Sequence, residues 1–438
     1  MQPREIALKI LYDIEKNQAY LNIAFQNHAS RGELSGRDAS FVKELVYGCL
    51  QHKLSLDYVI SRFSSVKLRK LAPYVICILR MGMYQLFYMD KVPESAAVNE
   101  SVRLAGRYAG RSRGFVNAVL RRASSEGISL PEGSDDETLA IRYSHPAPLV
   151  KWLRQQFGEE KMMKLLEENN QAPSLCLRVN KMKTSRQELL GRLAQEGISA
   201  DAGKVVDSAI LVHGGHVQKT EAYHEGLFTV QDQSAQLAAI VLAPNSGETV
   251  FDLCAAPGGK TTHLAELMND EGQIFALDIY EKRLLSVAET AKRLGLSIIT
   301  TKATDARTFA PQKQADKILI DAPCSGLGVI RRRPDLKYKE TLLDFEELVQ
   351  TQEAILQRSY ELLKSGGEMV YSTCTINPLE NEMMIQKFLQ KHPDCALVPV
   401  THSSLGETAR KTLQTGMGTF YPETDLGDGF FIAKLKKE

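Results

Sequence analysis

The chain has 438 residues, of which 43% are hydrophobic and 24% are charged. That composition is typical of globular proteins and excludes disordered and fibrous classes. The length exceeds what one hydrophobic core usually organises, so we expect a multidomain protein. No stretch is long and apolar enough to cross a bilayer, and the first residues lack the apolar core of a signal peptide. These features predict a cytoplasmic protein without membrane contact.

The cysteines and the charges restrict the chemistry further. Seven cysteines are scattered along the chain, without CxxC spacing and without a histidine cluster, so neither a disulfide framework nor a metal site is expected. The net charge of +1 hides an asymmetry: residues 1–130 hold 19 Lys and Arg against 11 Asp and Glu, which is +8 and leaves −7 for the rest. This basic segment suggests a polyanionic partner, most simply nucleic acid, although a solvated basic surface explains the charge equally well.

The first 130 residues are predicted to be an all-helical bundle of six or seven helices. In residues 4–16 the apolar side chains recur with helical spacing, and β-branched alternation is nearly absent throughout the region. A segment rich in Gly, Pro, Ser and acids follows at 126–137 and is typical of a linker. The other expected helices span residues 39–52, 56–61, 73–88, 96–107 and 113–123.

Two further modules are predicted downstream. Residues 144–236 mix strand-like runs with an amphipathic helix and are interpreted as a small α+β module. From about residue 237 to 438, strands and helices alternate regularly, which is typical of a Rossmann-like α/β domain with a mostly parallel sheet covered on both faces. Its expected strands are 249–253, 273–277, 297–301, 317–320 and 368–371, its expected helices are 260–268, 281–294 and 342–363, and 430–435 is predicted to be an edge strand.

Two cysteines follow strands in the same manner. Cys324 lies in Asp321-Ala322-Pro323-Cys324, directly after the run 317–320, and Cys374 lies in Ser372-Thr373-Cys374-Thr375, after 368–371. The carboxyl ends of parallel strands form the edge at which such sheets bind ligands. A thiolate there can act as a nucleophile if positive charge stabilises it, and Lys260 and the run 331–333 are candidate sources. The remaining cysteines, apart from Cys254, are interpreted as small buried hydrophobes.

A glycine-containing turn predicts a cofactor at the same edge. Residues 254–261, Cys-Ala-Ala-Pro-Gly-Gly-Lys-Thr, connect a strand to a helix. They lack the first glycine of a phosphate-binding loop and the spacing of a dinucleotide fingerprint, which favours a ligand without phosphates, such as S-adenosylmethionine. Asp278, Asp305 and Asp321 each follow a strand and are suited to a nucleoside and an amino-acid tail. For any one of them, a helix N-cap is an equally good interpretation.

These motifs resemble those of the RNA cytosine-C5 methyltransferases of the NOL/NOP/Sun family, and the helical region resembles NusB at 44–48 and 115–122. The resemblance implies that Cys374 attacks the base, that Cys324 resolves the adduct and that Asp321 holds the cytosine edge. It implies a monomeric enzyme acting on RNA, at cytosine 967 of the 16S ribosomal RNA of the small subunit. The residues implied to bind S-adenosylmethionine are Cys254, Ala255, Ala256, Pro257, Gly258, Gly259, Lys260, Asp278, Asp305 and Asp321.

Several alternatives stay open on the residues alone. DNA cytosine-C5 methyltransferases attack with a Pro-Cys cysteine, so the pattern also permits Cys324 as the nucleophile. A non-catalytic NusB-like RNA-binding, antitermination or ribosome-assembly factor is the main rival function, and a dehydrogenase is weaker because the dinucleotide glycines are missing. Arg178, Asn180 and the run 331–333 are candidate RNA contacts, with a solvated surface role as the alternative for each.

Overall fold

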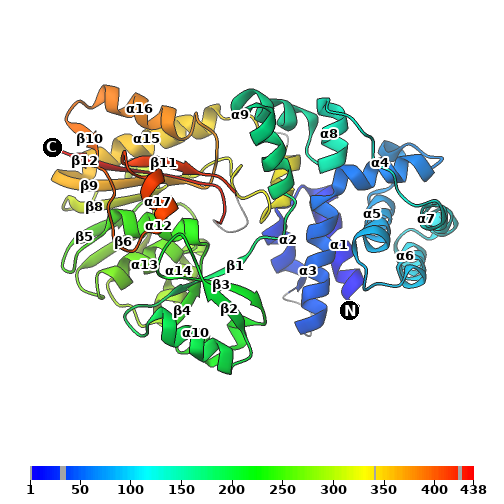
Figure 1. The fold of residues 1–438 in the computed structure, drawn as a ribbon, viewed down its shortest axis with the longest axis horizontal. Coiled ribbons are helices and arrows are strands. Elements are labelled where there is room, and N and C mark those ends of the chain that lie inside the picture. Colours follow the sequence, from blue (N-terminus) through cyan, green and yellow to red (C-terminus); the bar gives the residue numbers. More distant parts are fainter. Residues whose placement is uncertain (1, 30–35, 340–341, 423–426) are drawn as a thin grey trace. The chain divides into compact units, whose positions relative to one another are not determined.

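The computed structural model describes residues 2–29, 36–339, 342–422 and 427–438. The chain forms two compact units, which Figure 1 shows in ribbon form. Unit 1 comprises Met1–Gln171 together with Ile330–Glu340, and unit 2 comprises Ala172–Val329 together with Thr341–Glu438.

Unit 1 is helical, as the sequence predicts for residues 1–130, and two further helices, α8 and α9, extend it beyond that range. Helix α5 (Pro73–Tyr88) is apolar on nearly all sides and buries an unbroken run from Val75 to Gln85, which makes it the central helix of the bundle. The helices α1, α3, α4, α6 and α7 pack against it. The remaining helices are α1 Pro3–Asn17, α2 Leu21–Ala29, α3 Gly36–Gln51, α4 Lys53–Phe63, α6 Glu94–Tyr108, α7 Arg113–Glu126, α8 Asp136–Tyr143 and α9 Ala147–Glu168, with 3-10 turns η1 Leu68–Lys70 and η2 Gly110–Ser112.

A segment from much later in the chain completes unit 1. The turn η5 (Pro334–Tyr338) packs on α3 although it lies about three hundred residues downstream. Asp335 accepts the Leu21 amide at 3.1 Å, and the Lys337 ammonium donates to the Gln51 carbonyl at 2.9 Å. Arg331 is buried and pairs with Glu168 at 3.8 Å. The prediction of an RNA surface contact at position 331 is therefore wrong, because that side chain is engaged inside unit 1.

Unit 2 begins with a small α+β module. Its antiparallel sheet has the strand order β2-β3-β1-β4. Helix α10 (Arg186–Gln195) starts with a capping box, in which Ser185 and Glu188 satisfy each other's backbone amides, and it packs its apolar side on this sheet. The other elements are β1 Leu175–Val179, β2 Ser199–Ala202, β3 Ala209–Gly214, η3 Val217–Lys219, α11 Glu221–His224 and β4 Phe228–Val230.

The larger sheet of unit 2 is mostly parallel, as predicted. Its strands follow the order β10-β12-β9-β8-β5-β6-β7, and β5 to β9 pair in parallel while β10, β11 and β12 pair antiparallel. The strands are β5 Thr249–Asp252, β6 Gln273–Asp278, β7 Ile299–Ala303, β8 Ala315–Asp321, β9 Leu363–Thr373, β10 Cys395–Leu397, β11 Met417–Phe420 and β12 Phe430–Lys437. The helical elements are α12 Gln233–Leu242, α13 Gly259–Leu267, α14 Glu281–Leu294, η4 Ala306–Thr308, α15 Glu346–Leu362, α16 Glu382–Lys391 and α17 Glu407–Thr412.

Helices cover both faces of this sheet (Figure 1), because alternate strand residues point to opposite sides. Val250, Leu319 and Val370 join the core formed with α12, α13 and α14. Phe251 and Ile318 are the chain neighbours of Val250 and Leu319, so their side chains point to the opposite face of the sheet. They join the core formed with α15 and α16. The near-continuous apolar runs of these strands are explained by this double burial.

The expectation that residues 430–435 form an edge strand is wrong. β12 lies between β9 and β10 and also pairs with β11. Phe430 and Ile432 enter one core, and Phe431, Ala433 and Leu435 enter the other. A strand that is apolar on both faces belongs inside a sheet, so this pattern identifies an interior position.

Within the described ranges, no helix combines the length and apolar character that a bilayer crossing requires. The same residues contain no group of three or more His, Cys, Asp and Glu side chains arranged to hold a metal ion.

The buried Lys337 predicts a pH dependence of stability. Burial lowers its pKa to about 7, whereas the pKa of a lysine in an unfolded chain is about 10.4. Between these values the unfolded chain binds the extra proton, so the free energy of unfolding rises with pH from about 7 upward. Thermal unfolding of Lys337→Met should lack this rise. Its melting temperature relative to wild type should therefore fall as the pH increases from 7 to 9.5.

The half-buried neighbour Lys339 provides the matched control, because its ammonium also donates to a carbonyl, that of Gln18, but the residue is not fully buried. Lys339→Met should melt at a constant offset from wild type over the same pH range. Parallel pH profiles for wild type and Lys337→Met would contradict the assignment.

Candidate active site

The parallel register of unit 2 brings the predicted strand-end residues to one edge. Asp321 at the end of β8 is opposite Ser372 on β9, and Asp278 at the end of β6 is opposite Ala303 on β7. Asp252 ends β5 between them. Because all these strands run in the same direction, the loops that follow them share the carboxyl edge of the sheet.

The two thiols predicted to carry chemistry lie against each other. The Sγ atoms of Cys324 and Cys374 are 3.3 Å apart, and both residues are partly exposed. The backbone fixes this approach from two sides. The Ala322 amide donates to the Ser372 carbonyl at 2.9 Å, and the Gly328 amide donates to the Cys374 carbonyl at 3.0 Å.

A lysine and an aspartate adjoin the thiols. The Lys260 ammonium donates to Asp321 Oδ2 at 2.6 Å, and the Ser372 hydroxyl donates to Oδ1 of the same carboxylate at 3.2 Å. Burial acts to lower the pKa of Lys260, but Asp321, and more weakly Cys374, raise it above its ordinary value. Lys260 is therefore a fixed cation within electrostatic range of the Cys374 sulfur. The sequence predicts Lys260 as a source of positive charge for a thiolate, and the side chain lies beside the thiols.

The surroundings of Cys324 disfavour its charged form. Its contact with Cys374, burial and the carboxylates of Glu380 and Asp321 all raise the pKa of the Cys324 thiol well above its ordinary value. Two thiols in contact cannot readily both be anions, since like charges repel at this distance. Cys324 is thus held as a neutral thiol beside its partner.

The glycine turn is held tightly between β5 and α13. The Ala255 amide donates to the Leu277 carbonyl at 2.7 Å, and the Thr261 hydroxyl donates to the buried Asp252 carboxylate at 2.6 Å. Gly258 has a φ of +106°, and a Cβ there would lie 2.9 Å from the Cα of Val287. Both the conformation and the close approach require glycine at this position.

The remaining strand-end acids differ in availability. Asp278 is almost buried, accepts the Tyr280 amide at 2.9 Å and lies 3.3 Å from Arg283. Asp305 caps the turn η4, and both of its oxygens engage Arg307, which lowers the pKa of that carboxyl. Asp305 therefore serves as a helix cap, which is the alternative that the sequence left open for it. Asp278 does not cap α14, whose N-cap is Tyr280.

Apolar surface next to Asp278 was missed by the sequence analysis. Ile279 and Tyr280 directly follow β6 and are 58% and 59% exposed, which is unusual for large apolar side chains. Exposed apolar groups beside a strand-end carboxylate are suited to the face of a nucleobase. Their position immediately after the acid in the sequence was the available signal.

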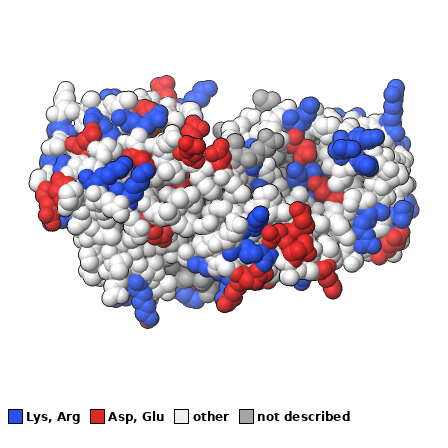
Figure 2. All heavy atoms as spheres, turned by 90° about the horizontal axis from the view of Figure 1, so that it is seen from above, with Lys and Arg blue, Asp and Glu red and all other residues white. Residues whose placement is uncertain are grey.

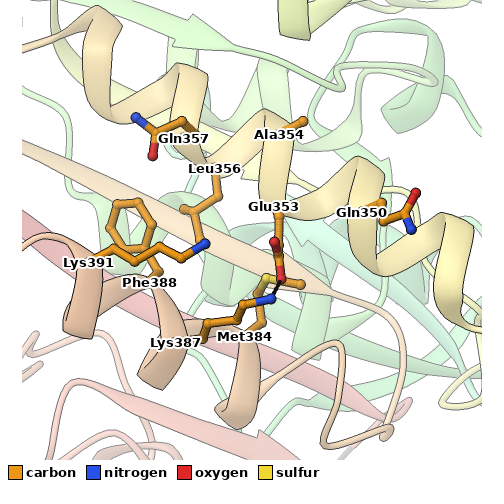
Figure 3. A pocket seen from close by; sticks show the side chains of 9 residues that line it. All are labelled: Gln350, Glu353, Ala354, Leu356, Gln357, Met384, Lys387, Phe388 and Lys391. Atoms are coloured by element: carbon orange, nitrogen blue, oxygen red, sulfur yellow. Dashed lines mark hydrogen bonds and ion pairs between the residues drawn. The ribbon is translucent and has the colours of Figure 1, made fainter.

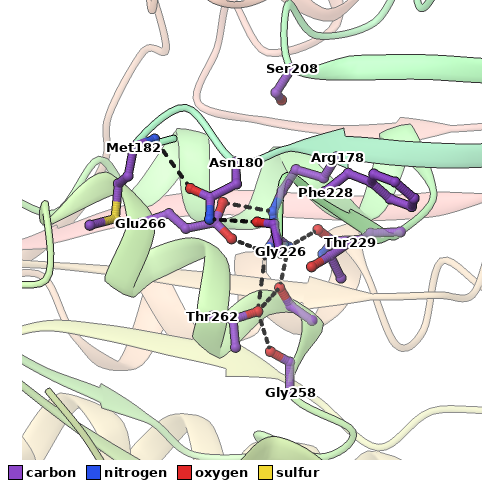
Figure 4. A network of polar contacts seen from close by, with 12 residues as sticks. Arg178, Asn180, Met182, Ser208, Gly226, Phe228, Thr229, Gly258, Thr262 and Glu266 are labelled. Carbon is purple, nitrogen blue, oxygen red and sulfur yellow. Dashed lines mark hydrogen bonds and ion pairs between the residues drawn. The ribbon is translucent and has the colours of Figure 1, made fainter. Parts of the chain in front are cut away.

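Arg178 and Asn180, predicted to contact RNA, are buried instead (Figure 4). Arg178 pairs with Glu266 at 2.7 Å and donates to the Gly259 carbonyl at 2.5 Å and to the Thr262 hydroxyl at 3.1 Å. Gly259 and Thr262 form the first turn of α13. Arg178 therefore fastens the small α+β module to the helix that carries the glycine turn, and the RNA-contact prediction is wrong for it.

Asn180 is occupied by its own loop. Its amide nitrogen donates to the Gly226 carbonyl at 3.1 Å, and its side-chain oxygen accepts the Met182 amide at 3.2 Å (Figure 4). With less than 2% of its surface exposed, it has no face to offer a ligand. The prediction of an RNA contact at this residue is also wrong.

Two surface features lie apart from the strand-end site. A groove of about 360 Å³ runs between α15 and α16, with Leu356, Met384 and Phe388 on its floor and Lys387 and Glu353 paired across it (Figure 3). None of the predicted site residues lines it. On the face seen in Figure 2, basic and acidic side chains are interspersed, so neither sign forms a continuous field there.

The fold and the site define an α/β methyltransferase domain with added helical and α+β modules, and family comparisons agree region by region. The model described as 16S rRNA methyltransferase RsmB/F matches residues 239–436. The NusB family model matches residues 1–125, and the ferredoxin-like domain of RsmF/B-like methyltransferases matches residues 145–218.

Whole-chain relatives agree with these matches. The probable ribosomal RNA small subunit methyltransferase B of Bacillus subtilis is 40% identical over 99% of this chain and 98% of its own length, and the Escherichia coli O7:K1 protein named ribosomal RNA small subunit methyltransferase B is 37% identical over 97% and 96%. The chain belongs to the RsmB/F family of 16S rRNA methyltransferases.

Solved structures show the same architecture. The crystal structure of PH0851 superposes with a TM-score of 0.81 at 27% identity, covering 100% of this chain and 99% of that one. NSun6 from Pyrococcus horikoshii, solved with SFG, gives a TM-score of 0.59 at 26% identity over 67% of this chain and 98% of that one.

The Arg178–Glu266 pair predicts a strong loss of stability when it is broken. Arg178→Met leaves Glu266 as an unpaired buried charge, which should cost about 3–5 kcal/mol in the free energy of unfolding. Urea unfolding monitored by circular dichroism measures this. Arg178→Met combined with Glu266→Met should recover much of the loss, because no charge then remains buried. A double variant as unstable as the single one would contradict the pairing.

Proposed function

We propose that this chain is an S-adenosylmethionine-dependent enzyme that methylates carbon 5 of a cytosine in 16S ribosomal RNA through a covalent adduct between Cys374 and carbon 6. The observation that carries the proposal is the pair of thiols, 3.3 Å apart at the carboxyl edge of the sheet, with the Lys260–Asp321 ion pair beside them. The names of the relatives support ribosomal RNA of the small subunit as the substrate.

The strand-end residues fit the cofactor. The turn from Cys254 to Lys260 offers a closely packed backbone, and Asp278 offers a carboxylate to ribose hydroxyls. Ile279 adds exposed apolar surface for the adenine face. Asp305 can bind the cofactor only if its carboxylate releases Arg307 and accepts hydrogen bonds from the cofactor instead. When bound, S-adenosylmethionine supplies an electrophilic methyl group.

Cys374 is the proposed nucleophile. Carbon 5 of cytosine is a weak nucleophile, and addition of a thiolate to carbon 6 pushes electron density onto it. The thiolate form needs a nearby cation, and Lys260 interacts with Cys374 while remaining anchored on Asp321. This support for Cys374 is independent of the family likeness.

Cys324 is proposed to handle the proton that leaves carbon 5. Its neighbours keep it as a neutral thiol, which makes it a poor first nucleophile. Once the Cys374 sulfur is bonded to carbon 6 it carries no charge, so Cys324 can give its own proton to solvent and, as a thiolate, accept the proton that leaves carbon 5. Loss of that proton restores the aromatic ring, and the electron pair of the Cys374–carbon 6 bond returns to sulfur. The 3.3 Å separation of the two sulfurs lets both act on adjacent ring carbons.

Asp321 is proposed to hold the cytosine edge. Its carboxylate is oriented by Lys260 and Ser372 and remains partly exposed. A carboxylate acceptor suits the exocyclic amine of cytosine, and this contact would discriminate against uracil, which offers an oxygen there. Reaching the site requires the base to leave its stack, which costs a few kcal/mol and less in a loop.

Transfer of labelled methyl groups tests the function. The full chain, incubated with labelled S-adenosylmethionine and 16S ribosomal RNA that lacks the modification, should label the RNA at one cytosine, which we place at position 967. Mapping of the modified nucleotide identifies the site. Binding of the RNA without any transfer would instead support a non-catalytic RNA-binding or assembly role.

The roles of the two cysteines predict opposite gel phenotypes. Cys324→Ala should accumulate a covalent protein–RNA adduct, because the adduct forms but does not resolve, whereas Cys374→Ala should form none. Denaturing gel electrophoresis after incubation with RNA and cofactor measures both. Retention of the adduct in Cys374→Ala and its loss in Cys324→Ala would assign the attack to Cys324.

A further inference from the structure

Glu380 is a carboxylate enclosed behind the two thiols. Its residue surface is 0% exposed, and its position just after Asn377 places it in the loop between β9 and α16. Oε1 accepts from the Ser325 hydroxyl at 2.5 Å and from the Asn377 amide group at 3.0 Å. Oε2 accepts from the Ser325 backbone amide and from the Gln352 amide group, each at 2.9 Å. All four partners are donors and none is a cation.

These contacts tie both thiol loops to one group. Ser325 follows Cys324 in the chain, so two hydrogen bonds from one residue anchor the Cys324 loop on Glu380. The Ser325 hydroxyl is also 2.7 Å from the hydroxyl of Thr375, which follows Cys374. Since the Ser325 proton goes to Glu380, the Thr375 hydroxyl donates to Ser325, and the chain of hydrogen bonds runs from one loop to the other.

The back of the Cys324 loop is held by the same network. Gln352 on α15 uses its amide group to bridge Glu380 and the Pro323 carbonyl, the latter at 2.8 Å. The Tyr371 hydroxyl donates to the Glu380 carbonyl at 2.8 Å. Glu380 therefore links the residues on both sides of Cys324 with the strand that leads to Cys374.

The charge of Glu380 acts on the Cys324 thiol. Its carboxylate is one cause of the raised pKa of Cys324, after the contact with Cys374 and burial. The titratable groups Asp321, Tyr371, Lys260, Asp252 and Cys254 also act on this site. The cation among them, Lys260, interacts with Cys374. One thiol thus faces a buried anion, and the other lies within range of a cation.

We propose that Glu380 is a positioning residue of the thiol pair: its buried carboxylate fixes the Cys324 loop against the Cys374 loop and, as an anion, directs the thiolate to Cys374. The inference rests on the proposed function for its purpose, because it explains how two adjacent cysteines take different roles. Its physical content, the different reactivity of the two thiols, is measurable without RNA or cofactor.

Alkylation of the two cysteines tests this content. Wild type and Glu380→Gln are treated with iodoacetamide over pH 6–10, and the modification of each cysteine is followed by peptide mass spectrometry. Glutamine has the same shape but no charge, and its amide nitrogen cannot accept the two hydrogen bonds that one carboxylate oxygen receives. In Glu380→Gln, Cys324 should react several-fold faster at neutral pH, and the midpoint of its pH profile should fall, because the anion that disfavours its thiolate is gone.

Two variants separate charge from anchoring. Ser325→Ala removes a hydrogen bond and retains the carboxylate, so the pH midpoint of Cys324 should stay at the wild-type position. Glu382→Gln changes a neighbouring glutamate that accepts from Thr419 on the far side of the loop, and it should leave both cysteines as in wild type. Melting temperatures show whether each variant is folded. An unchanged Cys324 midpoint in folded Glu380→Gln would overturn the proposal.

Methyl transfer adds a second readout. Glu380→Gln should lower kcat by about 10²-fold, the scale expected when reacting groups are misplaced by about 1 Å, with KM for the cofactor unchanged. If no variant, wild type included, methylates RNA, the proposed function fails while the alkylation result still decides the role of Glu380. Wild-type kcat in Glu380→Gln would contradict the positioning role.

Discussion

The parallel pairing of β8 with β9 is the constraint on which the site depends. It sets Asp321 opposite Ser372, so the loops that follow the two strands leave the sheet side by side. The cross-loop hydrogen bonds from Ala322 and Gly328 then fix the two thiols at 3.3 Å. A slip of the register would separate the sulfurs and also remove Ser372 from the Asp321 carboxylate. The placement of the two thiols therefore depends on backbone hydrogen bonds between the loops.

Electrostatics at this edge follows from how the acids are distributed. Asp252 is buried with its pKa raised to about 7, and it anchors the first turn of α13 through Thr261. Asp321 is paired with Lys260, and Glu380 is satisfied by neutral donors. Only one cation is thus fixed near the thiols among these contacts, and it adjoins Cys374. The small α+β module contributes as well, since Arg178 holds the turn at Gly259.

The sequence predicted the parts of this site that depend on local pattern and chain direction. Cysteines and acids placed directly after apolar runs had to meet at one edge once the sheet was parallel, and the helical bundle of the first 130 residues followed from helical spacing. The misses depend on long-range pairing. Arg178 is buried only because Glu266, 88 residues away, neutralises it. β12 is interior because strands from three parts of the chain add to it, and no local signal for Glu380 existed beyond its place near Cys374.

Two cysteines in contact behave as one system that holds at least one proton, because a second ionisation would place two like charges 3.3 Å apart. In the proposed reaction, a single cysteine could attack carbon 6, but no adjacent group would then accept the proton from carbon 5. A second thiol in contact can take part in that proton transfer only if the negative charge of the thiolate is held on one particular sulfur. In the proposal, the buried Glu380 carboxylate beside the Cys324 loop and the Lys260 cation in range of Cys374 supply that asymmetry.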